Sequence, residues 1–109
     1  MISSDDARMI INKWNQESSP VRCDVLVDGG SRFSMVGTID FVTDEGCGIR
    51  SPDKLCWLKF PFIAVHLYEY GDSRTANPEN KDFIAETYEA LLTIKAGFGL
   101  ISIGELKSS

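Results

Sequence analysis

Three cysteines and one histidine are the residues of this chain best suited to nucleophilic or metal chemistry: Cys23, Cys47, Cys56 and His66. A catalytic cysteine needs a positive neighbour or a helix N-terminus to favour its thiolate, and none of the three begins a recognisable helix. The four side chains are also zinc ligands by type, but no two cysteines have the close Cys-x-x-Cys spacing of a zinc knuckle. We therefore expect cysteines packed as small apolar residues, with no enzymatic activity, no metal and no cofactor. A cysteine-dependent enzyme that uses His66 is the alternative.

Basic and aromatic residues interleave in one part of the chain, and they form the candidate ligand-binding set: Arg32, Arg50, Lys54, Trp57 and Lys59. Such side chains together can hold a nucleotide or another small anion by charge and stacking. The competing interpretation places the cations on the solvated face of a sheet and Trp57 in the core. A nucleotide-binding or anion-binding module is therefore one of the functions to be tested.

Composition sets the class of protein and disfavours several partners. The 109 residues suffice for one domain, residues 1–109, and 11 basic against 16 acidic residues give a net charge of -5. This charge repels a phosphate backbone, so nucleic acid and anionic membranes are disfavoured as partners. No apolar run reaches the ~20 residues of a membrane helix. Because the cysteines are odd in number and the first residues do not resemble a signal peptide, we expect a cytoplasmic protein with reduced thiols.

Helical spacing is clearest in the N-terminal part of the chain. Ala7, Ile10, Ile11 and Trp14 recur at intervals of three and four residues. Ser4 can cap this segment, and a proline shortly after it prevents its continuation. The pattern predicts one amphipathic helix over residues 4–17 that covers an open end of the sheet.

From Val21 onward the apolar residues alternate, which is typical of strands. The second strand places Phe33, Met35, Ile39 and Phe41 on one face, and a glycine at position 37 would permit a sharp bend. Further strands are expected at residues 47–50, 55–70 and 99–106, whereas residues 78–95 fit either a helix or a strand. The predicted fold is α+β: a strongly bent antiparallel sheet of five or six strands or a small open β-barrel, with an N-terminal helix and a C-terminal helix.

The segment at residues 62–70 has apolar or aromatic side chains on both faces. Phe62, His66, Tyr68 and Tyr70 share one of these faces. A strand of this kind is covered either by the rest of its own domain or by a partner. We therefore expect a non-catalytic interaction domain that forms a homo-oligomer through this strand, the alternative being a monomer in which a helix covers the strand.

Residues 24–50 resemble the first half of Sm-like domains. The resemblance consists of an alternating strand, the Asp28-Gly29 turn, a bent strand containing Gly37, and Asp44 at the end of that strand. It implies a small open barrel and association through strand edges. Glu45 stands where the family has an RNA-binding asparagine, so the resemblance does not extend to RNA binding.

Overall fold

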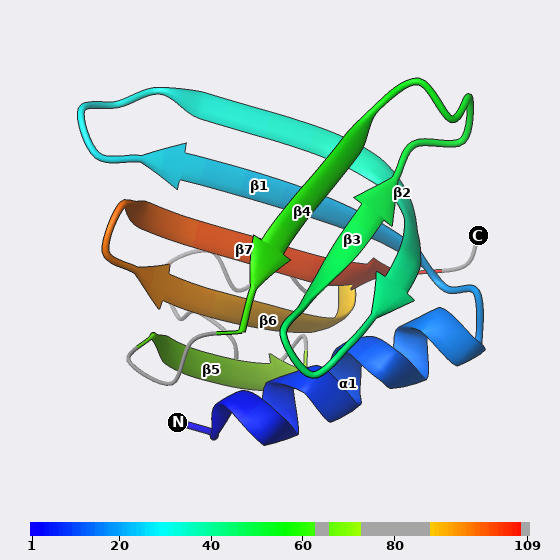
Figure 1. The fold of residues 1–109 in the computed structure, drawn as a ribbon, viewed down its shortest axis with the longest axis horizontal. Helices are drawn as coiled ribbons and strands as arrows, with labels where there is room; N and C mark the ends of the chain where they lie inside the picture. Colours follow the sequence, from blue (N-terminus) through cyan, green and yellow to red (C-terminus); the bar gives the residue numbers. More distant parts are fainter. Residues whose placement is uncertain (63–65, 73–87, 108–109) are drawn as a thin grey trace.

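The computed structural model describes residues 1–62, 66–72 and 88–107, which form one helix and a seven-stranded antiparallel sheet (Figure 1). The elements are α1 (Ser4–Gln16), β1 (Pro20–Val27), β2 (Arg32–Val42), β3 (Gly46–Arg50), β4 (Trp57–Pro61), β5 (Leu67–Asp72), β6 (Tyr88–Ala96) and β7 (Gly99–Leu106). Their order across the sheet is β4-β3-β2-β1-β7-β6-β5. The α+β class and the antiparallel sheet are confirmed. The sheet has more strands than expected and is not closed into a barrel.

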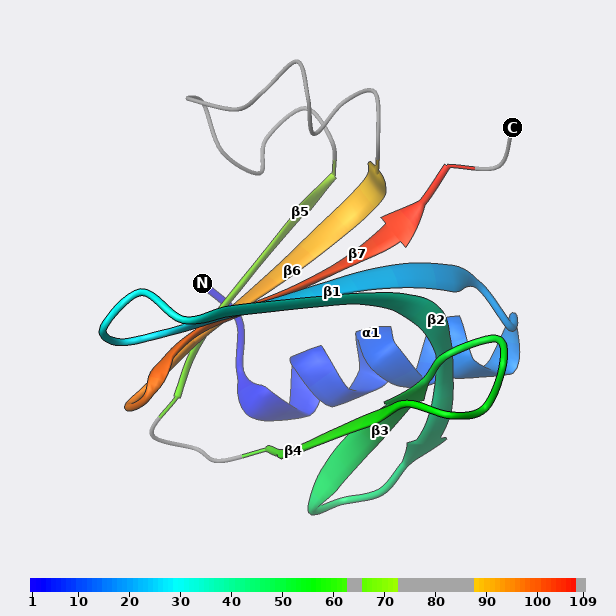
Figure 2. The ribbon, with the colours of Figure 1, turned by 90° about the horizontal axis from the view of Figure 1, so that it is seen from above.

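The sheet curves because its two edge strands follow each other in the sequence. Seven flat strands would separate β4 from β5 by about 29 Å, at ~4.8 Å for each pair of neighbours. The five Cα steps from Phe62 to Leu67 reach at most about 19 Å. Figures 1 and 2 show how the curvature is achieved: β2 bends, and the β3–β4 hairpin comes to lie across from β7 and β6. The strongly bent sheet predicted from the alternating strands is therefore present.

A β-bulge after Ile39 contributes to the bend of β2. Ile39 pairs with Ile49, but the next pair joins Phe41 to Gly48, so Asp40 is an additional residue in this strand. The shift turns Phe41 to the convex face, where its ring occupies the space that a side chain at Gly48 would need. The prediction that Phe41 shares the core face of Met35 and Ile39 was therefore wrong.

Helix α1 lies along the concave face of the sheet (Figure 2). Ala7, Ile11 and Trp14 are buried, which confirms the predicted apolar stripe. The helix contacts β2 and β5, which are not neighbours in the sheet. Its N-cap is Ser3, not Ser4, because the Ser3 side chain accepts a hydrogen bond from the Asp6 N–H at 3.1 Å.

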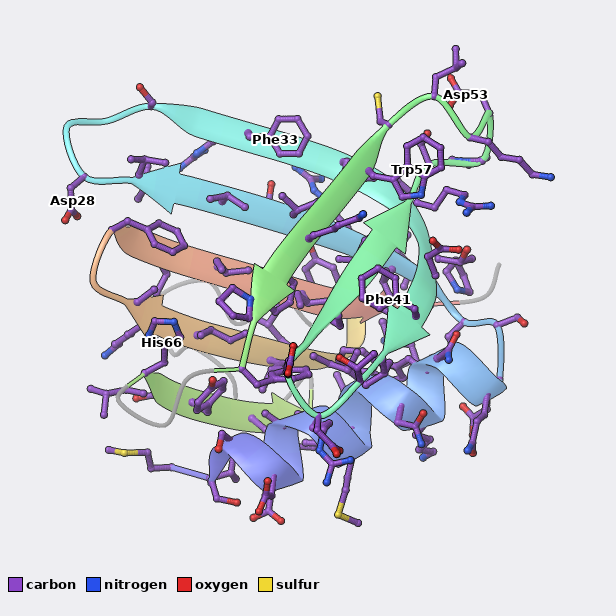
Figure 3. The ribbon with its side chains drawn as sticks, viewed as in Figure 1. Asp28, Phe33, Phe41, Asp53, Trp57 and His66 are labelled. Atoms are coloured by element: carbon purple, nitrogen blue, oxygen red, sulfur yellow. The ribbon has the colours of Figure 1, made fainter. Side chains whose placement is uncertain are left out.

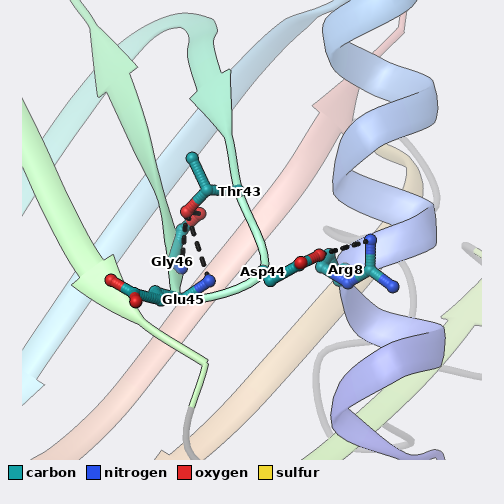
Figure 4. Close-up of polar contacts among 5 residues, drawn as sticks. All are labelled: Arg8, Thr43, Asp44, Glu45 and Gly46. Atoms are coloured by element: carbon teal, nitrogen blue, oxygen red, sulfur yellow. Dashed lines mark hydrogen bonds and ion pairs between the residues drawn. The ribbon is translucent and has the colours of Figure 1, made fainter.

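The turn between β2 and β3 contacts the helix at the surface (Figure 4). Thr43 Oγ1 accepts hydrogen bonds from the backbone N–H groups of Glu45 and Gly46, each at 3.2 Å. Arg8 of α1 lies 3.5 Å from Asp44 of this turn, but the Asp44 side chain is 94% exposed. An ion pair this exposed stabilises little, so the buried apolar contacts hold the helix against the sheet.

Strand β6 settles part of the ambiguity over residues 78–95. Tyr88, Ala90, Leu92 and Ile94 are buried in alternation, and β6 pairs with β5 on one side and β7 on the other. The prediction of a C-terminal helix is therefore wrong for residues 88–95. The apolar spacing of this segment also fits a helix, but its hydrogen bonds with strands on both sides stabilise the extended conformation. Residues 78–87 lie outside the described residues. No helix in the described part of the chain is long and apolar enough to cross a membrane.

Candidate functional site

The segment predicted as one strand at residues 62–70 belongs to two different edges of the sheet. Strand β4 ends at Pro61, and β5 begins at Leu67. Phe62 still pairs beyond the end of β4, where its N–H donates to the Glu45 carbonyl at 2.8 Å. The Phe62 ring packs edge to face on Phe60, with centroids 6.1 Å apart. Phe62 is half-buried against the core and presents little surface to a partner.

The remaining interface candidates differ sharply in exposure. Tyr68 is 1% exposed and belongs to the core, so its side chain is not available to a partner. The half-buried His66 ring lies with its centroid 6.3 Å from that of Tyr68. Tyr70, by contrast, is 44% exposed. Leu67 is 46% exposed and was absent from the predicted interface set, because it lies on the opposite face of the strand.

The outer edge of β5 is paired at Tyr68, whereas at Tyr70 it has no partner within the described part of the chain. The Ile2 N–H donates to the Tyr68 carbonyl at 2.9 Å, so that carbonyl points away from β6. Because residues of a strand alternate in the direction of their backbone groups, the N–H and C=O of Tyr70 also point outward. Among the described residues, Ile2 is the one that pairs with this edge.

The opposite edge, β4, carries features that oppose pairing. The Ser51 N–H donates to the Cys56 carbonyl at 3.0 Å, and with the β3–β4 register this directs the backbone of Lys59 and Pro61 outward. Proline lacks the N–H that a neighbouring strand would require, and an edge lysine resists burial. The two outer edges of the sheet are therefore not equivalent.

On the convex face, three members of the predicted ligand-binding set lie together on neighbouring strands. Arg50 pairs with Trp57 across β3 and β4, and its guanidinium carbon lies 4.9 Å from the Trp57 ring centroid. Asp40 accepts from both: Arg50 Nη2 is 3.1 Å from each carboxylate oxygen, and Trp57 Nε1 is 3.3 Å away. The Arg50 charge is thus neutralised within the protein. Trp57 is 49% exposed, so it is not the core residue of the competing interpretation.

Lys59 follows on the same face, with its ammonium nitrogen 5.8 Å from the centroid of Phe41 (Figure 3 labels Phe41 and Trp57). The other two members of the set are elsewhere. Lys54 lies in the loop between β3 and β4. Arg32 begins β2, six residues before the Thr38 that pairs with Arg50, or about 20 Å along the strand. The structure brings together Arg50, Trp57 and Lys59 but not Arg32.

The thiols occupy two kinds of environment. Cys23 and Cys47 are buried in the core, whereas Cys56 is exposed. Burial raises the pKa of Cys23 to about 12, with a smaller contribution from the Asp24 carboxylate. Burial also raises the pKa of the Cys47 thiol, with a smaller contribution from Cys23. Both buried thiols are therefore protonated at neutral pH, and such a thiol is a poor nucleophile or metal ligand. Across the described ranges, no three His, Cys, Asp or Glu side chains group as metal ligands.

A shallow hollow of about 340 Å³ lies where the β1–β2 and β6–β7 turns meet. Leu26, Leu100 and the backbone of Gly29 contribute to its lining. Phe98, in the β6–β7 turn, and Phe33, at the start of β2, are 45% and 46% exposed. The sequence pattern did not indicate this apolar end of the sheet, because its residues come from segments far apart in the chain.

The geometry defines the chain as a small, mostly-β α+β domain with one helix on the concave face of an open, curved sheet. The chain matches no family model, no curated protein and no solved structure. The function must therefore be argued from its own surfaces.

Proposed function

We propose that this chain is a non-catalytic interaction domain that associates with a second copy of itself through the edge of β5. The observation that carries the proposal is the outward-facing backbone of Tyr70 beside two exposed apolar side chains, Tyr70 and Leu67. An edge of this kind is a template for another strand. The resemblance to Sm-like domains, which implies association through strand edges, supports the same function.

The expected affinity is modest. Full burial of a large apolar side chain stabilises by about 1.5–3 kcal/mol. Tyr70 and Leu67 already have roughly half of their surface covered, so each has about 1 kcal/mol left to contribute for one copy. Backbone hydrogen bonds between the two edges add about 0.5–1.5 kcal/mol each. Summed over both copies, these contributions fall short of the roughly 8 kcal/mol that a micromolar dissociation constant requires, so we expect a weak association, at hundreds of micromolar, rather than an obligate dimer.

Light scattering on matched variants tests this function. Tyr70→Glu places a charge at the proposed interface, and Phe33→Glu places the same charge at an aromatic residue of similar exposure, 46% against 44%. We expect the average mass of the wild type and of Phe33→Glu to rise from 12.1 kDa towards twice that value at hundreds of micromolar, and Tyr70→Glu to remain monomeric. A wild type that is monomeric at all accessible concentrations would remove the proposal. Equal dissociation by both variants would place the interface elsewhere.

A second candidate function, a nucleotide-binding or anion-binding module, is favoured by the proximity of Arg50, Trp57 and Lys59 on one exposed face. Its weakness is the Asp40 carboxylate, which already satisfies the Arg50 charge. Trp fluorescence during a titration with ATP tests it, with Trp57→Phe as the control because the other tryptophan, Trp14, is buried. A saturable change that Trp57→Phe abolishes would support this function. No saturable change up to millimolar ATP would exclude it for this ligand.

The cytoplasm is the compartment we assign to the domain as part of the same proposal. All three cysteines are free, and two of them lie within the core. Free thiols persist in the reducing cytosol, where disulfides are rare. Labelled protein located in intact cells by fluorescence would test the assignment, and an extracellular location would contradict it.

A further inference from the structure

Resting on the second candidate function, nucleotide binding, we infer that the face formed by Arg50, Trp57 and Lys59 takes a nucleotide with a single negative charge. A cyclic mononucleotide has this charge, and the face binds it in preference to a nucleoside triphosphate. The preference is set by Asp40, which leaves one uncompensated positive charge on the face. Trp57 stacks on the base, and Lys59 binds the phosphodiester.

The Trp57 ring is held in place as a stacking surface. The guanidinium carbon of Arg50 lies over the ring, 4.9 Å from its centroid, and the ring Nε1 donates to Asp40 at 3.3 Å. These contacts use one face and the polar edge of the indole, but Trp57 is still 49% exposed. A base can therefore stack on the exposed surface of a ring that is already ordered, which lowers the entropic cost of binding.

Asp40 neutralises one of the two cations on this face. Its two carboxylate oxygens each lie 3.1 Å from Arg50 Nη2, and the Arg50 and Asp40 side chains are only 34% and 26% exposed. Salt screens a partly buried pair of this kind less than it screens a surface pair. A phosphate that approaches the face therefore meets a neutral pair at Arg50, and the Asp40 carboxylate repels any further negative charge.

Lys59 is the cation that remains. It lies on the exposed side of β4 with Trp57, two residues or about 7 Å further along the strand. In the described part of the chain, no carboxylate lies within ion-pair distance of its ammonium group. The ammonium nitrogen is 5.8 Å from the centroid of Phe41, which lies on the same face as Trp57 (Figure 3). Lys59 can therefore bind a phosphate group whose base stacks on Trp57.

The sum of these charges favours a monoanion. Arg50 and Lys59 contribute two positive charges and Asp40 one negative charge, which leaves one positive charge. The phosphodiester of a cyclic nucleotide carries one negative charge, whereas a phosphate monoester carries about −1.5 to −2 at pH 7 and a triphosphate carries more. The excess would lie beside Asp40 on a protein whose net charge is -5. The many phosphates of a nucleic-acid strand meet the same repulsion.

Four ligands with the same base and increasing negative charge test this inference: adenosine, cyclic AMP, AMP and ATP. The indole N–H of Trp57 gives its own signal in proton–nitrogen NMR spectra, and that of the buried Trp14 is an internal control. We expect cyclic AMP to bind at least about tenfold tighter than adenosine, because Lys59 adds a charge-assisted hydrogen bond. We also expect it to bind more tightly than ATP. An affinity that rises steadily with charge up to ATP would overturn the inference.

Three variants assign the charges to their residues. Asp40→Asn keeps an acceptor for the Trp57 N–H but frees the Arg50 charge, so ATP should bind at least about tenfold more tightly than it binds the wild type. Lys59→Gln should bind cyclic AMP no more tightly than adenosine. Lys54→Gln, in the loop between β3 and β4, is the matched control and should behave as the wild type. An Asp40→Asn variant that still prefers cyclic AMP, or a Lys59→Gln variant with wild-type affinity, would also overturn the inference.

The same titrations distinguish the charge preference from nucleotide binding itself. A wild type that binds ATP at least as tightly as cyclic AMP would leave nucleotide binding standing and remove only the preference for a monoanion. A Trp57 signal that does not shift with any of the four ligands up to millimolar concentrations would remove both.

Discussion

Gly37 of β2 lies directly against the backbone carbonyl of Arg50, so close that a Cβ at Gly37 would stand 2.0 Å from the Arg50 oxygen. The two residues belong to neighbouring strands, and their contact lies where the pairing of β2 with β3 begins, next to the Thr38–Arg50 pair. The missing side chain at Gly37 therefore permits the curvature that brings the β3–β4 hairpin across from β7 and β6 (Figures 1 and 2).

Gly37→Ala should lower the free energy of unfolding by at least about 2 kcal/mol, because the new methyl group meets backbone atoms that cannot move independently. Gly97→Ala is the matched control, since nothing lies within 4 Å of a Cβ there and its φ is not positive. Urea unfolding of both variants measures the difference. Similar stabilities for the two variants would show that the bend does not depend on Gly37.

The buried thiols should make the fold less stable at alkaline pH. An unfolded cysteine loses its proton near pH 8.5, whereas Cys23 in the fold retains it up to a pKa of about 12. The raised pKa therefore contributes stability that is complete below about pH 8.5 and is lost as the pH rises towards 12. Each buried thiol should reduce the free energy of unfolding by about 1.4 kcal/mol per pH unit in this window.

Urea unfolding at pH 8 and pH 10 tests this slope while limiting the contribution of Tyr88, whose pKa burial also raises. The double variant Cys23→Ala, Cys47→Ala should lose most of the pH dependence, whatever its absolute stability. An unchanged slope in the double variant would assign the effect to other groups.

Alkylation should distinguish the three cysteines in the folded protein. At pH 7.5, iodoacetamide should modify Cys56, which is exposed, and should reach Cys23 and Cys47 only after unfolding. Peptide mass spectrometry after timed labelling gives the rate at each residue. A reaction at any cysteine far faster than that of a free thiol, and slowed in His66→Ala, would instead favour the cysteine-dependent enzyme.

The sequence predicted the elements that have an unambiguous period, but not the partners of each strand. The helix has the expected apolar stripe of Ala7, Ile11 and Trp14. Strands β1 and β7 lie at the expected residues and alternate as expected. The orientation of Phe41 was missed, because the bulge that turns it depends on the pairing of β2 with β3 rather than on β2 alone.

The candidate site was only partly predictable for the same reason. Period two correctly placed Tyr68 and Tyr70 on one face of a strand, but it could not show that Tyr68 is buried in the core while Tyr70 is exposed. The neutralisation of Arg50, one of the interleaved cations, could not be predicted from the sequence either. The Asp40 carboxylate that neutralises Arg50 is ten residues away in the chain and lies beside Arg50 because β2 pairs with β3 in a register shifted by the bulge at Asp40.

Amide hydrogen exchange at Tyr70, followed by NMR at increasing protein concentration, tests the pairing of β5 most directly. The outward-facing N–H of Lys59 on β4 provides an internal control at the other edge of the same sheet. If β5 pairs with a second copy, the Tyr70 amide should become protected as the concentration passes through the micromolar range, while the Lys59 amide continues to exchange rapidly. A Tyr70 amide that exchanges at the same rate at every concentration would contradict self-association through β5.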